Sequence, residues 1–347
     1  KKGKIRDTHV VVNFSLEEDK LCFPHLLNSS CRKAMRPHFV SMLTYILLSS
    51  ISLLTVTLNL MVIISISHFR QLHTPTNLLL LSLAVSDFFV GLLVFFKIVL
   101  IECCWFLGDL ICILYTFLDF IITSASIGTM VLISVDRYVA ICEPLHYSNK
   151  VTEKRVKICV CLCWTCSAFL NTVLLKENLE EPGRYNSCFG ECVVVINYNF
   201  VLSDLFFTFI CPVTVIIVLY MRVFVVAVTQ ARVMRSHVAT LPLMFSTTIT
   251  AKKSEIKAAR TLGVVVVVFL MYVCPYYCFA LSGQDTLLNA SSATILICVF
   301  YFNSCLNPLI YAFFYPWFRR SMKLIVTLEI LQPGSYKKMY SVMFMKI

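Results

Sequence analysis

Seven long apolar segments, separated by short polar ones, constrain this chain more than any other feature. They lie at about 39–66, 77–101, 110–135, 157–176, 199–227, 260–282 and 292–315. A helix needs about 20 residues to cross the hydrocarbon core of a bilayer, and each segment is long enough. They lack the strict alternation of apolar and polar residues that is typical of membrane β-barrels. The sequence therefore predicts an all-α membrane protein, a bundle of seven transmembrane helices.

Composition and loop charges extend this prediction. Hydrophobic residues make up 59% of the 347 residues and charged residues 14%, whereas soluble domains carry about 25% charged residues. The segments after spans one, three, five and seven all carry lysine or arginine, from Arg70 alone in the first to several in the others, and such residues stay in the cytoplasm. We expect a multi-pass plasma-membrane protein with an extracellular tail at 1–38, a spanning domain at 39–315 and a cytoplasmic segment at 316–347.

This orientation also explains the net charge of +11. Anionic lipids of the cytoplasmic leaflet attract basic residues, so lipid is an expected partner and nucleic acid is not. Sequons for N-glycosylation at Asn13, Asn28 and Asn289 all fall on the predicted outer side. That side is oxidising and favours disulfides. The outer cysteines are Cys22, Cys31, Cys112, Cys188 and Cys192.

One carboxylate, Asp119, lies in the middle of the third apolar segment. An unpaired charge in hydrocarbon costs several kcal/mol, so an ionisable residue there indicates a functional site with a cationic partner. A ligand could supply that cation. The alternative is a structural ion pair with Lys97, near the outer end of span two.

A further set of polar residues is embedded in the spans. Such residues either hydrogen-bond between helices or form a hydrated core that holds a small cation. Hard oxygen ligands of this kind suit sodium. The predicted sodium ligands are Asp87, Ser126, Asn303 and Asn307. Apart from this allosteric ion, we expect no metal and no cofactor.

Charged residues also meet at the inner end of span three. Asp136 and Arg137 are adjacent there, and Glu255 begins span six on the same side of the membrane. A pair that breaks when helices move would form a two-state switch. The alternative is that Arg137 only extends its side chain to the interface.

Together these residues resemble the rhodopsin-like G-protein-coupled receptors. The resemblance covers all seven spans and is carried by Asn59, "LAVSD" ending at Asp87, Cys112, "DRY" at 136–138, Trp164, Pro212 with Tyr220, Pro275 and "NPLIY" at 307–311. A narrower resemblance, to the trace amine-associated receptors, rests on "NSCLNPLIYAFFYPWF" at 303–318 and "KAARTLG" at 257–263. That family has a short inner amphipathic helix after span seven.

The resemblance implies a function and several residue roles. Members sense volatile amines, mostly in olfactory neurons, and raise cyclic AMP through stimulatory G proteins. The ligand ammonium is expected at Asp119, supported by Tyr301. The residues implied in switching and G-protein coupling are Asp136, Arg137, Tyr138, Tyr220, Glu255 and Tyr311. The implied disulfides join Cys112 to Cys192, and Cys188 to either Cys22 or Cys31.

A second carboxylate refines the expected ligand. Asp204 lies in span five, about two turns into the membrane from its outer end. Two carboxylates that face one cavity repel each other, and a ligand with two ammonium groups would satisfy both. We therefore expect an aliphatic diamine such as cadaverine or putrescine. Aromatic rings of Tyr276 and Tyr277 would line the pocket.

Other classes of protein fit less well. Transporters show repeats or broken helices, and none is evident. An enzyme is not expected, because no nucleophile and base can be paired. A receptor for monoamines is one alternative. A seven-span scaffold that no longer signals is another, because Val273 stands where most members of the family carry a tryptophan.

Overall fold

The computed structural model describes most of the chain. The described residues are 21–26, 28–32, 38–101, 104–194, 202–238, 263–264, 266–272, 274–275 and 290–332. Several residues named above lie outside these ranges: Asn13, Glu255, Val273, Tyr276, Tyr277 and Asn289.

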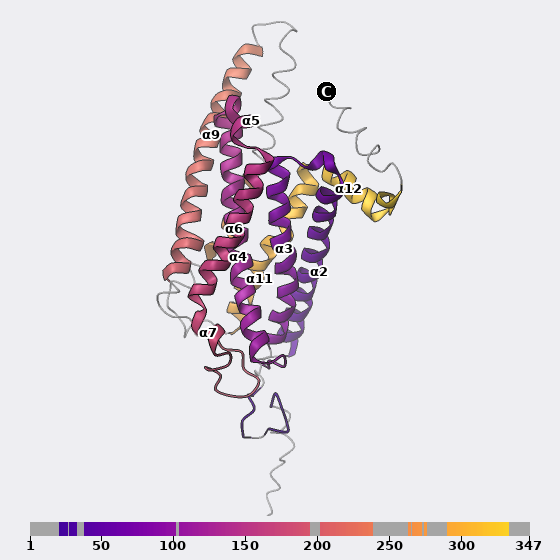
Figure 1. Ribbon diagram of the computed structural model, residues 1–347. Helices are drawn as coiled ribbons and strands as arrows, with labels where there is room; N and C mark the ends of the chain where they lie inside the picture. The colour runs from indigo at the N-terminus through magenta and orange to yellow at the C-terminus, as the bar shows by residue number, and fades with distance from the viewer. Residues whose placement is uncertain are drawn as a thin grey trace, which may run out of the picture.

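Long helices dominate the described residues and run side by side along one direction (Figure 1). They are α2 (His38–His68), α3 (Pro75–Ile101), α4 (Asp109–Cys142), α6 (Glu153–Leu174), α9 (Cys211–Val238) and α11 (Ala290–Phe314). Within the described residues, five helices are long and apolar enough to cross a membrane, and a shorter apolar helix covers Cys298–Phe314. The described part of predicted span six is also helical at 266–272.

The helices bury polar side chains among the apolar ones of the core and also expose many large apolar side chains. Asn59 and Asp87 are fully buried, whereas Phe95 and Phe313 are 61% and 78% exposed. A soluble protein rarely exposes so many large apolar side chains over its helices. This distribution fits a bundle surrounded by lipid.

A π-helical turn, η3 (Leu205–Ile210), precedes α9. Pro212 has no amide hydrogen and cannot donate to the carbonyl of Thr208, so the usual helical ladder is interrupted there. Instead, the amide of Cys211 donates to the carbonyl of Phe206, five residues earlier. Such wide turns are frequent at functional sites, and this one begins directly after Asp204.

The helix α12 (Pro316–Val326) follows span seven and runs across the inner end of the bundle (Figure 1). Phe318 and Leu324 are buried against the bundle, whereas Arg319 donates to the carbonyls of Ala312 and Phe313 at 2.9 Å. An amphipathic helix of this kind lies in the membrane interface. It matches the inner helix that the resemblance implied.

Three disulfides hold the outer end together. Cys112 at the start of α4 bonds Cys192, as the resemblance implied. Of the two partners considered for Cys188, the structure selects Cys31. Cys22 does not bond Cys188. It bonds Cys104, which the sequence analysis did not count among the outer cysteines. The segment around Cys22 and Cys31 is thereby fixed to two different loops.

Hydrogen bonds join these loops as well. The amide of Cys31 donates to the carbonyl of Phe189 at 3.0 Å, and the amide of Trp105 donates to the carbonyl of Gly190 at 2.7 Å. Gly190 has a φ of 97°, which favours glycine. The N-terminal segment, the loop after α3 and the loop at 181–194 therefore form one cap over the bundle.

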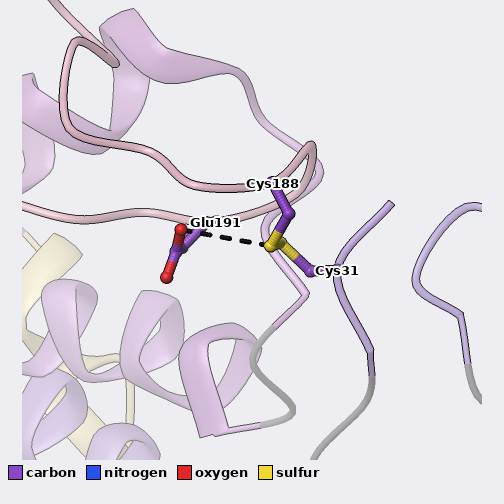
Figure 2. Close-up of side chains that lie close together, drawn as sticks. All are labelled: Cys31, Cys188 and Glu191. Carbon is purple, nitrogen blue, oxygen red and sulfur yellow. Dashed lines mark hydrogen bonds between the residues drawn. A yellow bond between two sulfur atoms is a disulfide. The ribbon is translucent and has the colours of Figure 1, made fainter. Parts of the chain in front are cut away.

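Glu191 faces the Cys31–Cys188 bond (Figure 2). These three side chains lie close enough to suggest a metal site, but both sulfurs are bonded to each other and cannot act as thiolate ligands. Glu191 instead accepts two 2.7 Å hydrogen bonds, from the amide and the hydroxyl of Ser187. The bond from the hydroxyl is the main reason why the pKa of Glu191 is lowered. Glu191 therefore adds a stable negative charge to the outer cap.

Candidate functional site

Asp119 is held between two helices. It lies on α4, and Tyr301 on α11 donates its hydroxyl hydrogen toward the two carboxylate oxygens, each at 3.0 Å. From α3, the ammonium of Lys97 lies 3.3 Å from Asp119 Oδ2. The structure thus brings together Asp119 and Tyr301, as the resemblance implied. It also forms the Lys97 ion pair that was the alternative.

Aromatic rings surround this ion pair. The ammonium of Lys97 lies 5.1 Å from the ring centroid of Tyr115 and 5.9 Å from that of Tyr301. Tyr115 precedes Asp119 by one helical turn, so both side chains lie on one face of α4. Phe96 and Trp105 pack against Tyr115, with ring centroids 5.5 and 6.1 Å away. A carboxylate beside aromatic faces is a suitable site for an organic cation.

Asp204 lies elsewhere. Its half-buried side chain lines a cavity of about 310 Å³ between α4, α6 and the η3 segment. Polar lining residues include Ser124 and Asn171, whose Nδ2 lies 3.4 Å from Ser124 Oγ. Asp119 is not among the lining residues. A pocket that Asp119 and Asp204 share therefore stays a prediction.

The predicted sodium ligands lie within the helical bundle in two pairs. Asn307 Nδ2 donates to Asp87 Oδ2 at 2.8 Å. The other oxygen of Asp87 and the amide oxygens of Asn303 and Asn307 are buried, with no hydrogen-bond partner among the described residues. A small cavity of about 20 Å³ is lined by Ser126 and Asn303, whereas Asp87 and Asn307 are not among its lining residues. Such a volume holds one water or one ion. Free buried oxygens of this kind are ligands that suit a hard cation such as sodium.

A closed ionic cluster occupies the inner end of α4. Arg137 pairs with its neighbour Asp136 and donates to Thr76 at 2.6 Å. Thr76 and Tyr147 each donate to Asp136, at 3.0 and 2.9 Å. Burial and the nearby Asp136 raise the pKa of the Tyr147 phenol, so it stays protonated as a donor. Arg137 is buried and does not extend to the interface.

Thr76 and Tyr147 are functional candidates that the sequence analysis missed. Tyr147 follows Asp136 by 11 residues, outside α4, and nothing in a single sequence places its hydroxyl on that carboxylate. The partner proposed from sequence, Glu255, lies outside the described residues.

The tyrosines implied in switching lie on the same side of the bundle. Tyr138 is half-buried and packs against a small apolar cluster of Ile141 on α4 and Val223 on α9. Tyr220 and Tyr311 have buried hydroxyls with no hydrogen-bond partner among the described residues. Hydroxyls in such positions can find partners when helices move.

Comparison with known proteins identifies the fold. Residues 58–311 match the family model described as 7 transmembrane receptor (rhodopsin family). The chain is 38% identical over 331 residues to trace amine-associated receptor 13c of Danio rerio, covering 92% of this chain and 95% of the relative. Identity is 37% over 341 residues to receptor 8a of Rattus norvegicus and 35% over 334 residues to receptor 4 of Mus musculus. These alignments cover 93% of this chain in both cases, with 97% and 95% of the relatives.

The chain belongs to the trace amine-associated receptors. The prediction of an all-α bundle of seven transmembrane helices is thereby confirmed. As a member of this receptor family, the protein is a multi-pass plasma-membrane receptor for small amines and is not an enzyme. Its partners are a small-molecule ligand and a G protein.

Asn28 is a predicted glycosylation site that lies within the described residues. Its side chain is exposed in the outer cap of the trace amine-associated receptor, where a glycan would find space. Glycosylation stays a prediction at Asn28, as it does at Asn13.

Proposed function

We propose that this receptor recognises aliphatic diamines of the cadaverine or putrescine type and raises cyclic AMP through a stimulatory G protein. In this proposal the receptor acts in olfactory sensing, as the resemblance suggests. The observation that carries the amine site is the environment of Asp119: a tyrosine hydroxyl orients the carboxylate, and an ammonium already lies 3.3 Å from it. One end of the diamine binds there.

The second ammonium binds Asp204. A five-carbon diamine spans about 7 Å between its nitrogens when extended. Asp204 leads into η3, which contacts α4, the helix that carries Asp119. Acidic residues of the outer loops, Glu177, Glu181 and Glu191, raise the local concentration of dications. In this proposal the ligand extends from the Asp119 site toward Asp204.

Replacing Asp204 with alanine tests this proposal. The potency of cadaverine should fall about tenfold to a hundredfold, because a hydrogen bond to a charged group is worth about 1.5–3 kcal/mol. Pentylamine, which has the same carbon chain and one amine, should keep or improve its potency. Cyclic AMP in receptor-expressing cells is the readout. Glu180→Gln is the matched control, because it removes an exposed outer charge that is not among the residues lining the Asp204 cavity.

A second candidate is a monoamine receptor in which Asp204 has no part in ligand binding. The observation that favours it is the separate cavity lined by Asp204, which does not include Asp119. Under this candidate, Asp204→Ala leaves the potency of cadaverine unchanged. The diamine model would then be rejected, while the amine site at Asp119 would stand.

Sodium is proposed as a negative allosteric ion of this receptor. Asp87, Ser126, Asn303 and Asn307 would hold it, and the ion would offset the buried charge of Asp87 in the inactive state. Agonist affinity should then fall about fivefold or more as sodium replaces potassium at constant ionic strength. Asp87→Asn should remove this dependence. Equal effects of sodium and potassium on the unmodified receptor would mean that these residues form only a hydrogen-bond network.

A further inference from the structure

Lys97 turns its charge into the bundle. A lysine near the end of a transmembrane helix usually extends its ammonium to the water at the interface. The Lys97 side chain is only 25% exposed, and its ammonium lies 3.3 Å from Asp119 Oδ2. The position of this ammonium is therefore set by the Asp119 carboxylate and not by the water at the membrane surface.

The ammonium of Lys97 contacts the same groups that would bind the ammonium of an amine ligand. Asp119 supplies the counter-charge, and Tyr301 orients that carboxylate from the other side. The rings of Tyr115 and Tyr301 supply two aromatic faces, within 6 Å, the usual limit for cation–π attraction. The receptor's own side chain thus fills the place that an amine ligand would take.

The exchange of charges has a direct consequence for ligands. The charge of Asp119 is already paired with that of Lys97. The ammonium of a ligand can therefore pair with Asp119 only by replacing the ammonium of Lys97. Lys97 then loses its counter-charge in a partly dehydrated site, which opposes binding. A ligand with one ammonium has no further contact to offset the free energy lost when Lys97 is displaced. A ligand that also binds elsewhere with a second group gains binding free energy from that contact.

We propose that Lys97 is an internal ammonium that fills the Asp119 site of the empty receptor, and that amine agonists bind by displacing it. This inference rests on the amine function proposed above. Lys97 thereby sets the concentration at which amines act. It also favours ligands that make contacts beyond Asp119.

The first experiment tests the internal pair without any ligand. The thermal stability of the purified full chain is compared for the unmodified receptor, Lys97→Met, Asp119→Asn and the double variant. Asp119→Asn alone should lower the melting temperature, because Lys97 is left unpaired. In the Lys97→Met background the same change should cost nothing. Additive effects in this double-mutant cycle would overturn the inference. The double variant also keeps the test valid if Asp119→Asn alone folds poorly.

The second experiment tests displacement. Lys97→Met keeps an unbranched side chain but removes the charge, so the EC50 of pentylamine should fall at least about tenfold. Lys97→Arg retains the charge and should stay near the unmodified value. Lys176→Met is the matched control, because it removes an exposed outer charge that pairs only with Glu180 among the described residues. An unchanged or higher EC50 for Lys97→Met would overturn displacement.

The two experiments separate this inference from the proposed function. Amines that neither activate nor thermally stabilise the unmodified receptor or Lys97→Met would contradict the amine function, and displacement with it. The stability cycle would still decide whether Lys97 fills the Asp119 site. Amines that act on both receptors with equal potency would contradict displacement alone.

Discussion

Replacing Asp119 with asparagine is expected to cause a large loss of amine potency. Asparagine has nearly the same shape and keeps one acceptor for Tyr301, so the change removes mainly the charge. Loss of one partner of a buried charge pair costs about 2–5 kcal/mol, which corresponds to a decrease in potency of at least about thirtyfold. The EC50 for cyclic AMP measures this directly.

The control for Asp119→Asn is Asp109→Asn. Asp109 begins the same helix and accepts a hydrogen bond from Asn186 at 2.9 Å, so its replacement also removes an acidic group from α4. It should leave potency within about threefold. Surface expression is measured for both variants. An Asp119→Asn receptor that reaches the surface and responds with unchanged EC50 would show that amines are not bound through this carboxylate.

Breaking the Cys112–Cys192 bond is expected to have the second large effect. The bond closes a sequence separation of 80 residues. Cross-links of this length stabilise a fold by about 4.5 kcal/mol in the chain-entropy model. Total stabilities are only about 5–15 kcal/mol, so most of the receptor carrying Cys112→Ala should fail to reach the cell surface.

Surface labelling of intact cells measures this loss. Cys161→Ala is the control, because Cys161 is an exposed free cysteine on α6 and its replacement should leave surface expression unchanged. Cys112→Ala present at the normal surface level and with normal amine potency would show that the bond is dispensable for both folding and ligand binding.

Apolar length and embedded polar residues account for what could be predicted from the sequence. Each long helix in the described residues coincides with a predicted span. A run of about 20 apolar residues is stable in lipid as a helix, so the length of the run predicts the helix. Asp119 and Tyr301 could be placed together because their positions on α4 and α11 match a family pattern. The same holds for Cys112 and Cys192.

Features that depend on the orientation and the partners of individual side chains could not be predicted in this way. Spacing does not determine which cysteines pair, and Cys22 bonds Cys104 rather than Cys188. Asp204 has a position along span five that suits a shared pocket, but it lines the cavity toward α6. Tyr147 reaches Asp136 from outside the spans, where no periodic pattern guides a prediction.

The most direct test of the central claim compares cadaverine with pentylamine on the unmodified receptor. The two compounds share a five-carbon chain and differ in the second ammonium. Cyclic AMP is measured over a full concentration range in cells with confirmed surface expression, beside cells that lack the receptor. We expect both compounds to raise cyclic AMP and cadaverine to have an EC50 at least about tenfold lower. Pentylamine with the lower EC50 would contradict diamine recognition, and no rise in cyclic AMP with either compound would contradict an amine receptor that couples to a stimulatory G protein.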